Sequence, residues 1–231
     1  MNIVLLKEWS ALPKHLKIAE VRPYYEHLQK HKASLVLTRI FDIILAAVLL
    51  VVLSPLLIIV SAWVKLSEPR EKVFYLQTRV TQYGKHFLIY KFRTMHTVTD
   101  GAQITTLGDV RITKAGKILR KYRLDELPQL FNILKGDMAF VGTRPEVLRY
   151  VACYRGEMLA TLLLPAGVTS TASIAYKDEA KILSCAVSAD DIYVKEVLPA
   201  KMLYNLDDIR KYGIWHNIKI ILKTLSSVLA S

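Results

Sequence analysis

From Arg120 the chain reads Arg120-Lys-Tyr-Arg-Leu-Asp125-Glu126-Leu-Pro-Gln-Leu-Phe-Asn-Ile-Leu-Lys-Gly-Asp137-Met-Ala-Phe-Val-Gly-Thr-Arg144-Pro-Glu146. This stretch places two adjacent carboxylates among basic residues at a predicted helix start. Asp125 is the expected N-cap, which leaves Glu126 in the first turn. Pro128 is tolerated there because the first N–H groups of a helix have no intrahelical partner. A helix, a Gly-Asp turn and an apolar run follow, so the acid pair is expected inside a folded unit.

The acid pair and its arginines favour a site for phosphate groups. A helix start offers free N–H groups and the positive end of the helix dipole to an anion. Arg120, Arg123 and Arg144 add forked donors that match phosphate oxygens. Asp125 and Glu126 also suit Mg²⁺, which takes one or two carboxylates together with substrate phosphates. Taken alone, the pair is more typical of a solvated, ion-paired helix start than of a phosphate site.

The composition fits one globular domain with an unusually apolar segment. The chain has 231 residues, 52% of them hydrophobic, and a formal net charge of +12. A charge of this sign suits nucleic acid, an anionic membrane surface or phosphate-rich substrates. The two cysteines, Cys153 and Cys185, lack metal-ligand spacing. A disulfide framework is therefore not expected, which fits a reducing compartment.

The apolar segment runs from Ile43 to Val64, 22 residues without a formal charge. A straight helix of that length covers about 33 Å, enough to cross a hydrocarbon core, so a plain transmembrane helix is one reading. Pro55 at its centre predicts a kink, because it removes the hydrogen bond to the Val51 carbonyl. The Ser54 hydroxyl is a candidate donor to the freed carbonyl.

Basic residues flank both ends of this segment: Lys30, Lys32 and Arg39 before it, Lys65, Arg70 and Lys72 after it. Positive charge tends to stay on the cytoplasmic side of a membrane. A hairpin that enters and leaves by the same face satisfies both the kink and the charges. Arg39 and Asp42 lie one turn apart on the predicted helix and are expected to interact at the membrane interface.

Several shorter elements are expected outside the apolar segment. Residues 1–36 form either an amphipathic surface segment or a short helix packed on the domain. Val73–Val80 and His86–Arg93 predict a β-hairpin, followed by a polar loop over 94–106. Helices are predicted over Asp109–Arg120, Tyr204–Arg210 and Trp215–Leu229. The last carries a broad apolar face, for which core packing is the expectation and membrane contact the alternative: Trp215, Ile218, Ile221, Leu222 and Leu225.

The chain resembles the bacterial sugar transferase family, the monotopic phosphoglycosyl transferases, in four strings: Arg120 to Glu146, Lys91-Phe-Arg-Thr-Met95, Thr38-Arg39-Ile-Phe-Asp42 and Ser54-Pro55. The resemblance runs from about Leu37 to the C-terminus and is looser from Thr161 onward. It implies an α+β fold, in which residues 37–66 form a re-entrant helix–break–helix membrane anchor containing Arg39, Asp42, Ser54 and Pro55. Residues 67–231 would form a small, mostly helical catalytic domain with a β-hairpin. The implied location is the cytosolic face of a bacterial inner membrane.

The resemblance also implies a reaction, in which a sugar 1-phosphate moves from a nucleotide diphosphate sugar, most often a UDP-sugar, to undecaprenyl phosphate. This step begins the assembly of cell-surface glycans or exopolysaccharides. Asp125 is the expected nucleophile, forming an acyl phosphate. Glu126 is expected to help bind Mg²⁺ with Asp125, or to act as a base. Arg93, on the resemblance alone, joins Arg120 and Arg144 as an expected phosphate ligand. A phospholipid membrane, and not nucleic acid, is the expected partner, and the oligomeric state, a homodimer included, is open.

Two departures from the family pattern concern loops. Thr143 stands where the family more often has proline, and Ser170-Thr171 stands where many members have Gly-Trp. The segment Gly167–Glu179 is therefore expected to influence donor choice, with hydroxyls from Thr169, Ser170 and Tyr176 available. The alternative is an ordinary surface loop.

Two other functions are compatible with parts of the sequence. A membrane-tethered binding or assembly protein would use the basic charge for nucleic acid or anionic lipid, but it gains nothing from two acids among its arginines. A phosphatase or pyrophosphatase would use the same residues with water as the acceptor. It would release sugar phosphate without any lipid.

Overall fold

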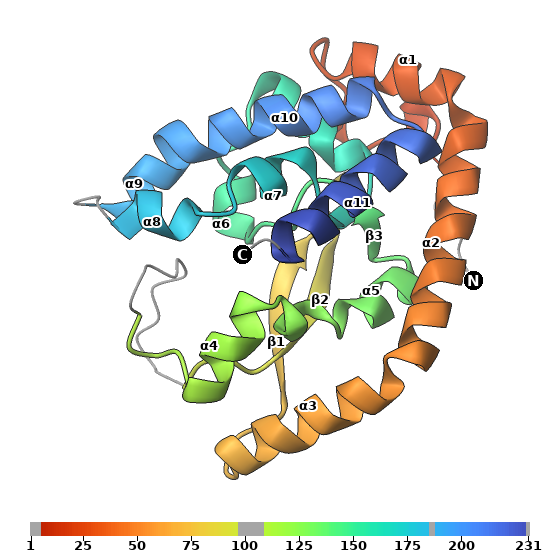
Figure 1. Ribbon diagram of the computed structural model, residues 1–231. Helices are drawn as coiled ribbons and strands as arrows, with labels where there is room; N and C mark the ends of the chain where they lie inside the picture. Colours follow the sequence, from red (N-terminus) through yellow and green to blue (C-terminus); the bar gives the residue numbers. More distant parts are fainter. Residues whose placement is uncertain (1–5, 97–108, 185–187, 230–231) are drawn as a thin grey trace.

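A computed structural model of the chain describes residues 6–96, 109–184 and 188–229. In Figure 1, α2 and α3 bound a domain of short helices and small sheets along two sides. The helices are α1 (Arg22–Lys30), α2 (Lys32–Val52), α3 (Ser54–Ser67), α4 (Lys114–Lys121), α5 (Gln129–Lys135), α6 (Leu148–Val151), α7 (Thr171–Ala175), α8 (Glu179–Ser184), α9 (Ala189–Ile192), α10 (Leu198–Arg210) and α11 (Ile214–Leu229). Most of the polar loop expected over 94–106 lies outside the described residues.

The strands form two separate pairs: β1 (Phe74–Val80) with β2 (His86–Phe92), and β3 (Met138–Val141) with β4 (Ala166–Thr169). The β1–β2 hairpin is antiparallel, with Phe74 opposite Phe92 and Val80 opposite His86. It confirms the predicted hairpin to within a residue at its outer ends. The β3–β4 pair is parallel and was not expected from the sequence. The fold is thus mixed helix and strand, as predicted, with one more sheet.

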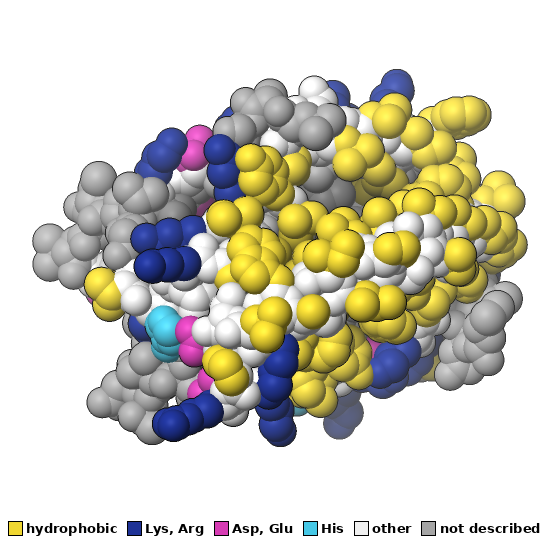
Figure 2. Space-filling view, turned by 60° about the horizontal axis from the view of Figure 1, so that its bottom comes forward, with side chains coloured by type: hydrophobic (Ala, Val, Ile, Leu, Met, Phe, Trp, Pro, Cys, Tyr) yellow, Lys and Arg dark blue, Asp and Glu magenta, His cyan; other side chains and the backbone are white. Residues whose placement is uncertain are grey.

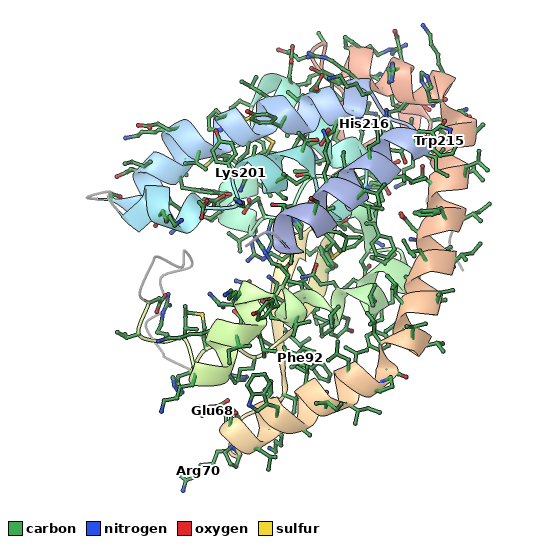
Figure 3. The ribbon with its side chains drawn as sticks, in the orientation of Figure 1. Glu68, Arg70, Phe92, Lys201, Trp215 and His216 are labelled. Carbon is green, nitrogen blue, oxygen red and sulfur yellow. The ribbon has the colours of Figure 1, made fainter. Side chains whose placement is uncertain are left out.

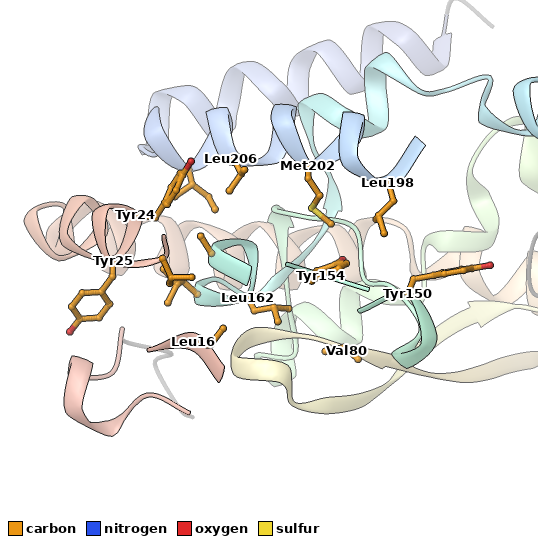
Figure 4. Packing of buried hydrophobic residues seen from close by; sticks show 14 of the residues in the cluster. Leu16, Tyr24, Tyr25, Val80, Tyr150, Tyr154, Leu162, Leu198, Met202 and Leu206 are labelled. Carbon is orange, nitrogen blue, oxygen red and sulfur yellow. The ribbon is translucent and has the colours of Figure 1, made fainter. Parts of the chain in front are cut away.

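Apolar residues of the N-terminal segment, beginning with Leu6, belong to the main hydrophobic core. Leu16, Val21 and Leu28 are fully buried. They share a cluster with residues from the other end of the domain, including Leu198 and Met202 of α10, and Figure 4 shows α10 side chains directed at this cluster. The open question about this part of the chain is therefore answered in favour of a segment packed on the domain.

The apolar segment forms two helices with a sharp break between them. α2 is long and apolar enough to cross a membrane, and it ends at Val52, where Leu53 leaves the helical conformation (φ −90°, ψ 4°). α3 then starts at Ser54 with Pro55 in its first turn and runs off in a different direction (Figure 1). The Ser54 hydroxyl donates to the Val51 carbonyl at 2.8 Å. The break and its replacement hydrogen bond agree with the sequence prediction.

The outer surface of α2 and α3 is strongly apolar. Large side chains near the break, among them Val51, Val52, Ile58 and Ile59, are more than 60% exposed to solvent. Figure 2 shows hydrophobic side chains covering much of this face, with lysines and arginines around its margin. A patch of this kind marks a surface that contacts a membrane or another protein.

Three predicted helices differ from the structure, and the one predicted over Tyr204–Arg210 already begins at Leu198 as α10. The helix expected from Asp109 begins only at Lys114, because the Asp109 carboxylate binds Arg111 and the Thr113 hydroxyl accepts from the Gly116 N–H at 2.9 Å as the N-cap. In α11 only part of the face predicted to pack on the core does so, because Ile218 and Ile221 are half-buried and the other three residues are exposed. Trp215 is 76% exposed, and Leu222 and Leu225 are also exposed. Figure 3 shows Trp215 at the outer edge of the domain.

Candidate active site

The acid pair lies in a tight turn ahead of α5. Residues Leu124–Glu126 form one 3₁₀ turn, and Arg123 before it adopts a left-handed conformation (φ 56°). The α-helix proper starts at Gln129, with Pro128 preceding it. The prediction that Asp125 caps the helix is wrong, because the 3₁₀ turn places Asp125 four residues before the helix begins. Its carboxylate is thereby left for other contacts.

The two carboxylates have different surroundings. Glu126 is held by two cations: Lys91 Nζ lies 3.0 Å from Oε1, and the Arg144 guanidinium contacts both carboxylate oxygens. Asp125 is 8% exposed, and its Oδ1 is buried with no hydrogen-bond partner in the part of the chain that the structure describes. A buried acceptor without a partner is costly unless a ligand, ion or water completes it.

These surroundings separate the acidities of the pair. Burial and the negative charge of Glu126 raise the pKa of Asp125 above its usual range. Burial would also raise the pKa of Glu126, but Arg144 and Lys91 outweigh it and hold that pKa well below its usual range. Two carboxylates whose environments push their pKa values apart are suited to different chemical roles.

Arg144 reaches Glu126 from the loop that follows β3. The β3–β4 pair fixes this loop: Gly167 N–H donates to the Thr143 carbonyl at 2.9 Å, and a Cβ on Gly167 would lie 2.1 Å from the Gly142 nitrogen. The Arg79 guanidinium donates to the Pro145 carbonyl at 3.2 Å from β1. A side chain at Gly167 would therefore clash with the backbone of Gly142.

The other predicted arginines differ in position. Arg120, on α4, donates through Nε to the Thr94 hydroxyl at 2.9 Å, and its charge interacts with Asp125. Arg93 instead donates to the Lys72 carbonyl at 2.9 Å and pairs with Glu71 at 3.2 Å, both in the link between α3 and β1. The structure therefore gathers Arg120 and Arg144 at the acid pair and gives Arg93 contacts in the link between α3 and β1.

Lys91 is the site residue that sequence reasoning passed over. In the sequence it stands out only as the first residue of the family string Lys91-Phe-Arg-Thr-Met95, although its side chain is mostly buried against Glu126. Strand alternation was the available signal, because residues 91 and 93 lie on one face of β2 and its extension. Nothing in the local sequence indicated which of the two would turn toward the acids.

The anchor residues connect α2 to the same site. Arg39 donates to the Leu134 carbonyl at 3.4 Å and to the Met138 carbonyl at 3.5 Å, and the Asp42 carboxylate accepts from the Phe140 N–H. Both side chains are buried. The charges of Arg39 and Asp42 attract across one helical turn, but their hydrogen bonds bind α2 to α5 and β3, the two elements that follow the acid pair in the chain.

The residues present fit a bound Mg²⁺ supplemented by substrate. The unpartnered Asp125 Oδ1 is the hard oxygen donor that this ion prefers. Within the described ranges no group of three or more His, Cys, Asp or Glu side chains gathers as a complete metal site. An ion held by Asp125 and Glu126 would thus take its remaining ligands from phosphates and water.

Comparison with known proteins places the chain in a family. The family model described as "Bacterial sugar transferase" matches residues 33–231. The chain is 34% identical over 194 residues to the UDP-N-acetylgalactosamine-undecaprenyl-phosphate N-acetylgalactosaminephosphotransferase of Aeromonas hydrophila, a match that covers 81% of this chain and 42% of that protein. It is 35% identical over 196 residues to the UDP-glucose:undecaprenyl-phosphate glucose-1-phosphate transferase of Escherichia coli, covering 82% and 39%.

A shorter relative, the UDP-glucose:undecaprenyl-phosphate glucose-1-phosphate transferase of Caulobacter vibrioides, is 32% identical over 198 residues, covering 84% of this chain and 70% of the relative. The chain spans about two fifths of the length of the Aeromonas and Escherichia proteins. The family match extends from α2 through the acid pair to the C-terminus. The chain belongs to the bacterial sugar transferase family.

Proposed function

We propose that the chain transfers a sugar 1-phosphate from a UDP-sugar to undecaprenyl phosphate at a membrane surface, the first step in assembling a cell-surface glycan. The observation that carries the proposal is the divided acid pair, in which Glu126 is neutralised by Lys91 and Arg144 while Asp125 keeps a buried oxygen without a partner. The names of the relatives support the choice of substrates.

Two displacements at phosphorus account for the transfer. The Asp125 carboxylate attacks the sugar-linked phosphorus of the donor, a bond to the acyl oxygen forms, and the bond to the bridging oxygen breaks as UMP leaves. A phosphate oxygen of the lipid then attacks the same phosphorus and releases the Asp125 carboxylate. The products are UMP and a polyprenyl diphosphate sugar, so the enzyme returns to its starting state.

The surrounding residues have electrostatic tasks in this scheme. Arg144 and Arg120, which interact with the acid pair, would balance the growing negative charge on the leaving UMP. A carboxylate whose pKa is held this low is a weak base, so we assign Glu126 to positioning Lys91 and Arg144 and not to proton removal. Mg²⁺ bound by Asp125 and Glu126 would supply further neutralisation of the diphosphate.

The proposed function is tested by a donor screen. Purified protein is incubated with undecaprenyl phosphate and each of several UDP-sugars, and UMP release is measured. At least one donor should release UMP in amounts equal to the lipid product formed. Absence of UMP with every UDP-sugar, combined with salt-sensitive binding of DNA, would instead support the binding protein.

The raised pKa of Asp125 predicts an acid limb in the rate of the first step. Only the ionised carboxylate attacks, so the rate should fall as the pH drops through that raised pKa. Glu126→Gln removes the neighbouring negative charge and should move this limb to lower pH, even as it reduces the maximal rate. An acid limb unchanged in Glu126→Gln, measured by rapid-quench detection of UMP, would show that another group controls it.

Activity should depend on a divalent cation. Excess EDTA is expected to reduce turnover by about 10²-fold or more, and Mg²⁺ added beyond the chelator should restore it, because a diphosphate and two carboxylates otherwise carry uncompensated charge. Ca²⁺, which tolerates irregular coordination, is the comparison ion. Full turnover in EDTA would remove the metal from the scheme.

We further propose that α2 and α3 form a re-entrant anchor. The break at Leu53, the basic residues before α2 and at the end of α3, and the apolar outer surface support it. Such an anchor would hold the acid pair at headgroup depth, where a soluble donor and a lipid acceptor meet. The buried contacts of Arg39 and Asp42 would fix the distance between anchor and site.

The topology is tested by cysteine labelling in intact cells. With Cys153 and Cys185 replaced, single cysteines at Lys14 and at Ser226 should both be protected from an impermeant thiol reagent. Both should react after permeabilisation. Reaction of only one of them from outside would show that α2 spans the membrane. As a companion, Pro55→Ala should favour a straighter helix and shift part of the population toward that spanning form.

A further inference from the structure

A small cavity with both polar and apolar side chains in its wall adjoins Arg144, the residue that also pairs with Glu126. Its wall includes Thr143, Arg144, Ser170, Ser173, Lys201 and Asn205, and Figure 3 shows Lys201 extending from α10 into the interior of the domain. The cavity has room for a group of about the size of one water molecule or hydroxyl. Arg144 lines the cavity and also binds Glu126. A single side chain therefore connects the cavity to the acid pair.

The charges around the cavity are already paired. Lys201 Nζ lies 2.8 Å from Glu179 Oε2 and 3.9 Å from Glu146 Oε1, and Arg144 is occupied by Glu126. A second anion would have to displace one of these carboxylates, and a cation would face two guanidinium or ammonium groups. A neutral group fits the cavity best.

One acceptor in the wall is without a partner. Asn205 is 4% exposed, and its Oδ1 is buried with no hydrogen bond to any described residue. Its amide nitrogen has only a weak contact with Met202 Sδ at 3.8 Å. The nearby Ser170 and Ser173 hydroxyls are 3.1 Å apart and bond to each other. No described O–H or N–H group donates to Asn205 Oδ1, which leaves this acceptor available to a bound group.

We propose that Asn205 accepts a hydrogen bond from a hydroxyl of the donor's sugar and so determines which sugar is transferred. This inference rests on the proposed function, which places the sugar one phosphate away from Asp125. The proposal also revises the expectation that hydroxyls of the segment Gly167–Glu179 determine donor choice directly. Thr169 bonds to Thr224 at 2.7 Å and Ser170 caps α7, so the segment contributes through the cavity wall and not through free hydroxyls of Thr169 and Ser170.

The test compares Asn205→Ala with Asn217→Ala. Asn217 is a matched control because it is also 4% exposed with a side-chain atom lacking a partner, but it lies on α11 and does not line the cavity. The donors are the preferred UDP-sugar, its epimers and its monodeoxy analogues, and kcat/KM is measured for each. Wild type should disfavour one deoxy analogue by about tenfold or more.

Asn205→Ala should lose about tenfold with the preferred donor and less than twofold with that same deoxy analogue, while Asn217→Ala keeps the wild-type ratio. An equal loss with all donors, accompanied by a lower Tm, would mean that the cavity holds only a structural water and would overturn the inference. So would wild-type indifference to every deoxy analogue, a result that needs no variant to fold. If wild type turns over no UDP-sugar, it is the proposed function that fails.

Discussion

Asp125→Asn is expected to abolish the covalent phosphosugar adduct and to reduce turnover by about 10⁴-fold or more, as loss of a nucleophile does in other enzymes that use covalent intermediates. The amide has no charge with which to attack phosphorus, yet it fills the same space in the 3₁₀ turn. Intact mass spectrometry after incubation with the donor and no lipid should show one added phosphosugar on the wild type and none on the variant.

Asp137→Asn provides the matched control for this experiment. Asp137 follows α5 in the same stretch of sequence, and its backbone carbonyl accepts from the Thr81 hydroxyl. Its side chain is not among the contacts of the acid pair, so this variant should form the adduct as wild type does. An adduct that persists in Asp125→Asn would assign the nucleophile to another residue.

Arg144→Ala is expected to lower turnover by about 10²- to 10³-fold, the range seen when one group that stabilises developing charge is removed. The loss has two causes. Negative charge on the leaving UMP loses a nearby cation, and Glu126 keeps Lys91 as its only ion-pair partner among the described residues. Arg144→Lys should recover only part of the activity, because an ammonium group cannot contact both Glu126 carboxylate oxygens as the planar guanidinium group does.

The control for Arg144 is Arg149→Ala. Arg149 lies five residues further along and is about half exposed, and its partner Asp190 is at the surface. Surface pairs contribute little to stability, so turnover should stay within about twofold of wild type. Thermal unfolding of both variants distinguishes a lost charge from a lost fold. Activity of a folded Arg144→Ala within threefold of wild type would contradict the role given to this residue.

The features predicted correctly depend on local sequence. Alternating residues define the β1–β2 hairpin, and Ser54-Pro55 defines the break between α2 and α3 because proline acts on the carbonyl four residues earlier. The expected proximity of Arg144 to the acid pair is also observed, as a contact with Glu126, and all three residues lie within one continuous stretch. In each case the interactions that fix the structure are encoded by residues close together in the chain.

The features that were missed depend on distant contacts. β3 and β4 are strands of four residues that pair in parallel across more than 20 positions, and neither has a pattern that identifies its partner. The exposed face of α11 was assigned to the core because periodicity shows where an apolar face is, not what covers it. The burial of Lys91 against Glu126 likewise follows from the packing of β2 on the 3₁₀ turn.

Transfer from the isolated adduct to lipid tests the central claim most directly. The adduct would be formed with a UDP-sugar, freed of nucleotide by gel filtration, and mixed with undecaprenyl phosphate alone. We predict that the added mass leaves the protein at a rate that rises with lipid concentration, and that polyprenyl diphosphate sugar appears in equal amount. An adduct that ignores the lipid, or that decays to free sugar phosphate at the same rate with and without it, would contradict the account and identify water as the acceptor.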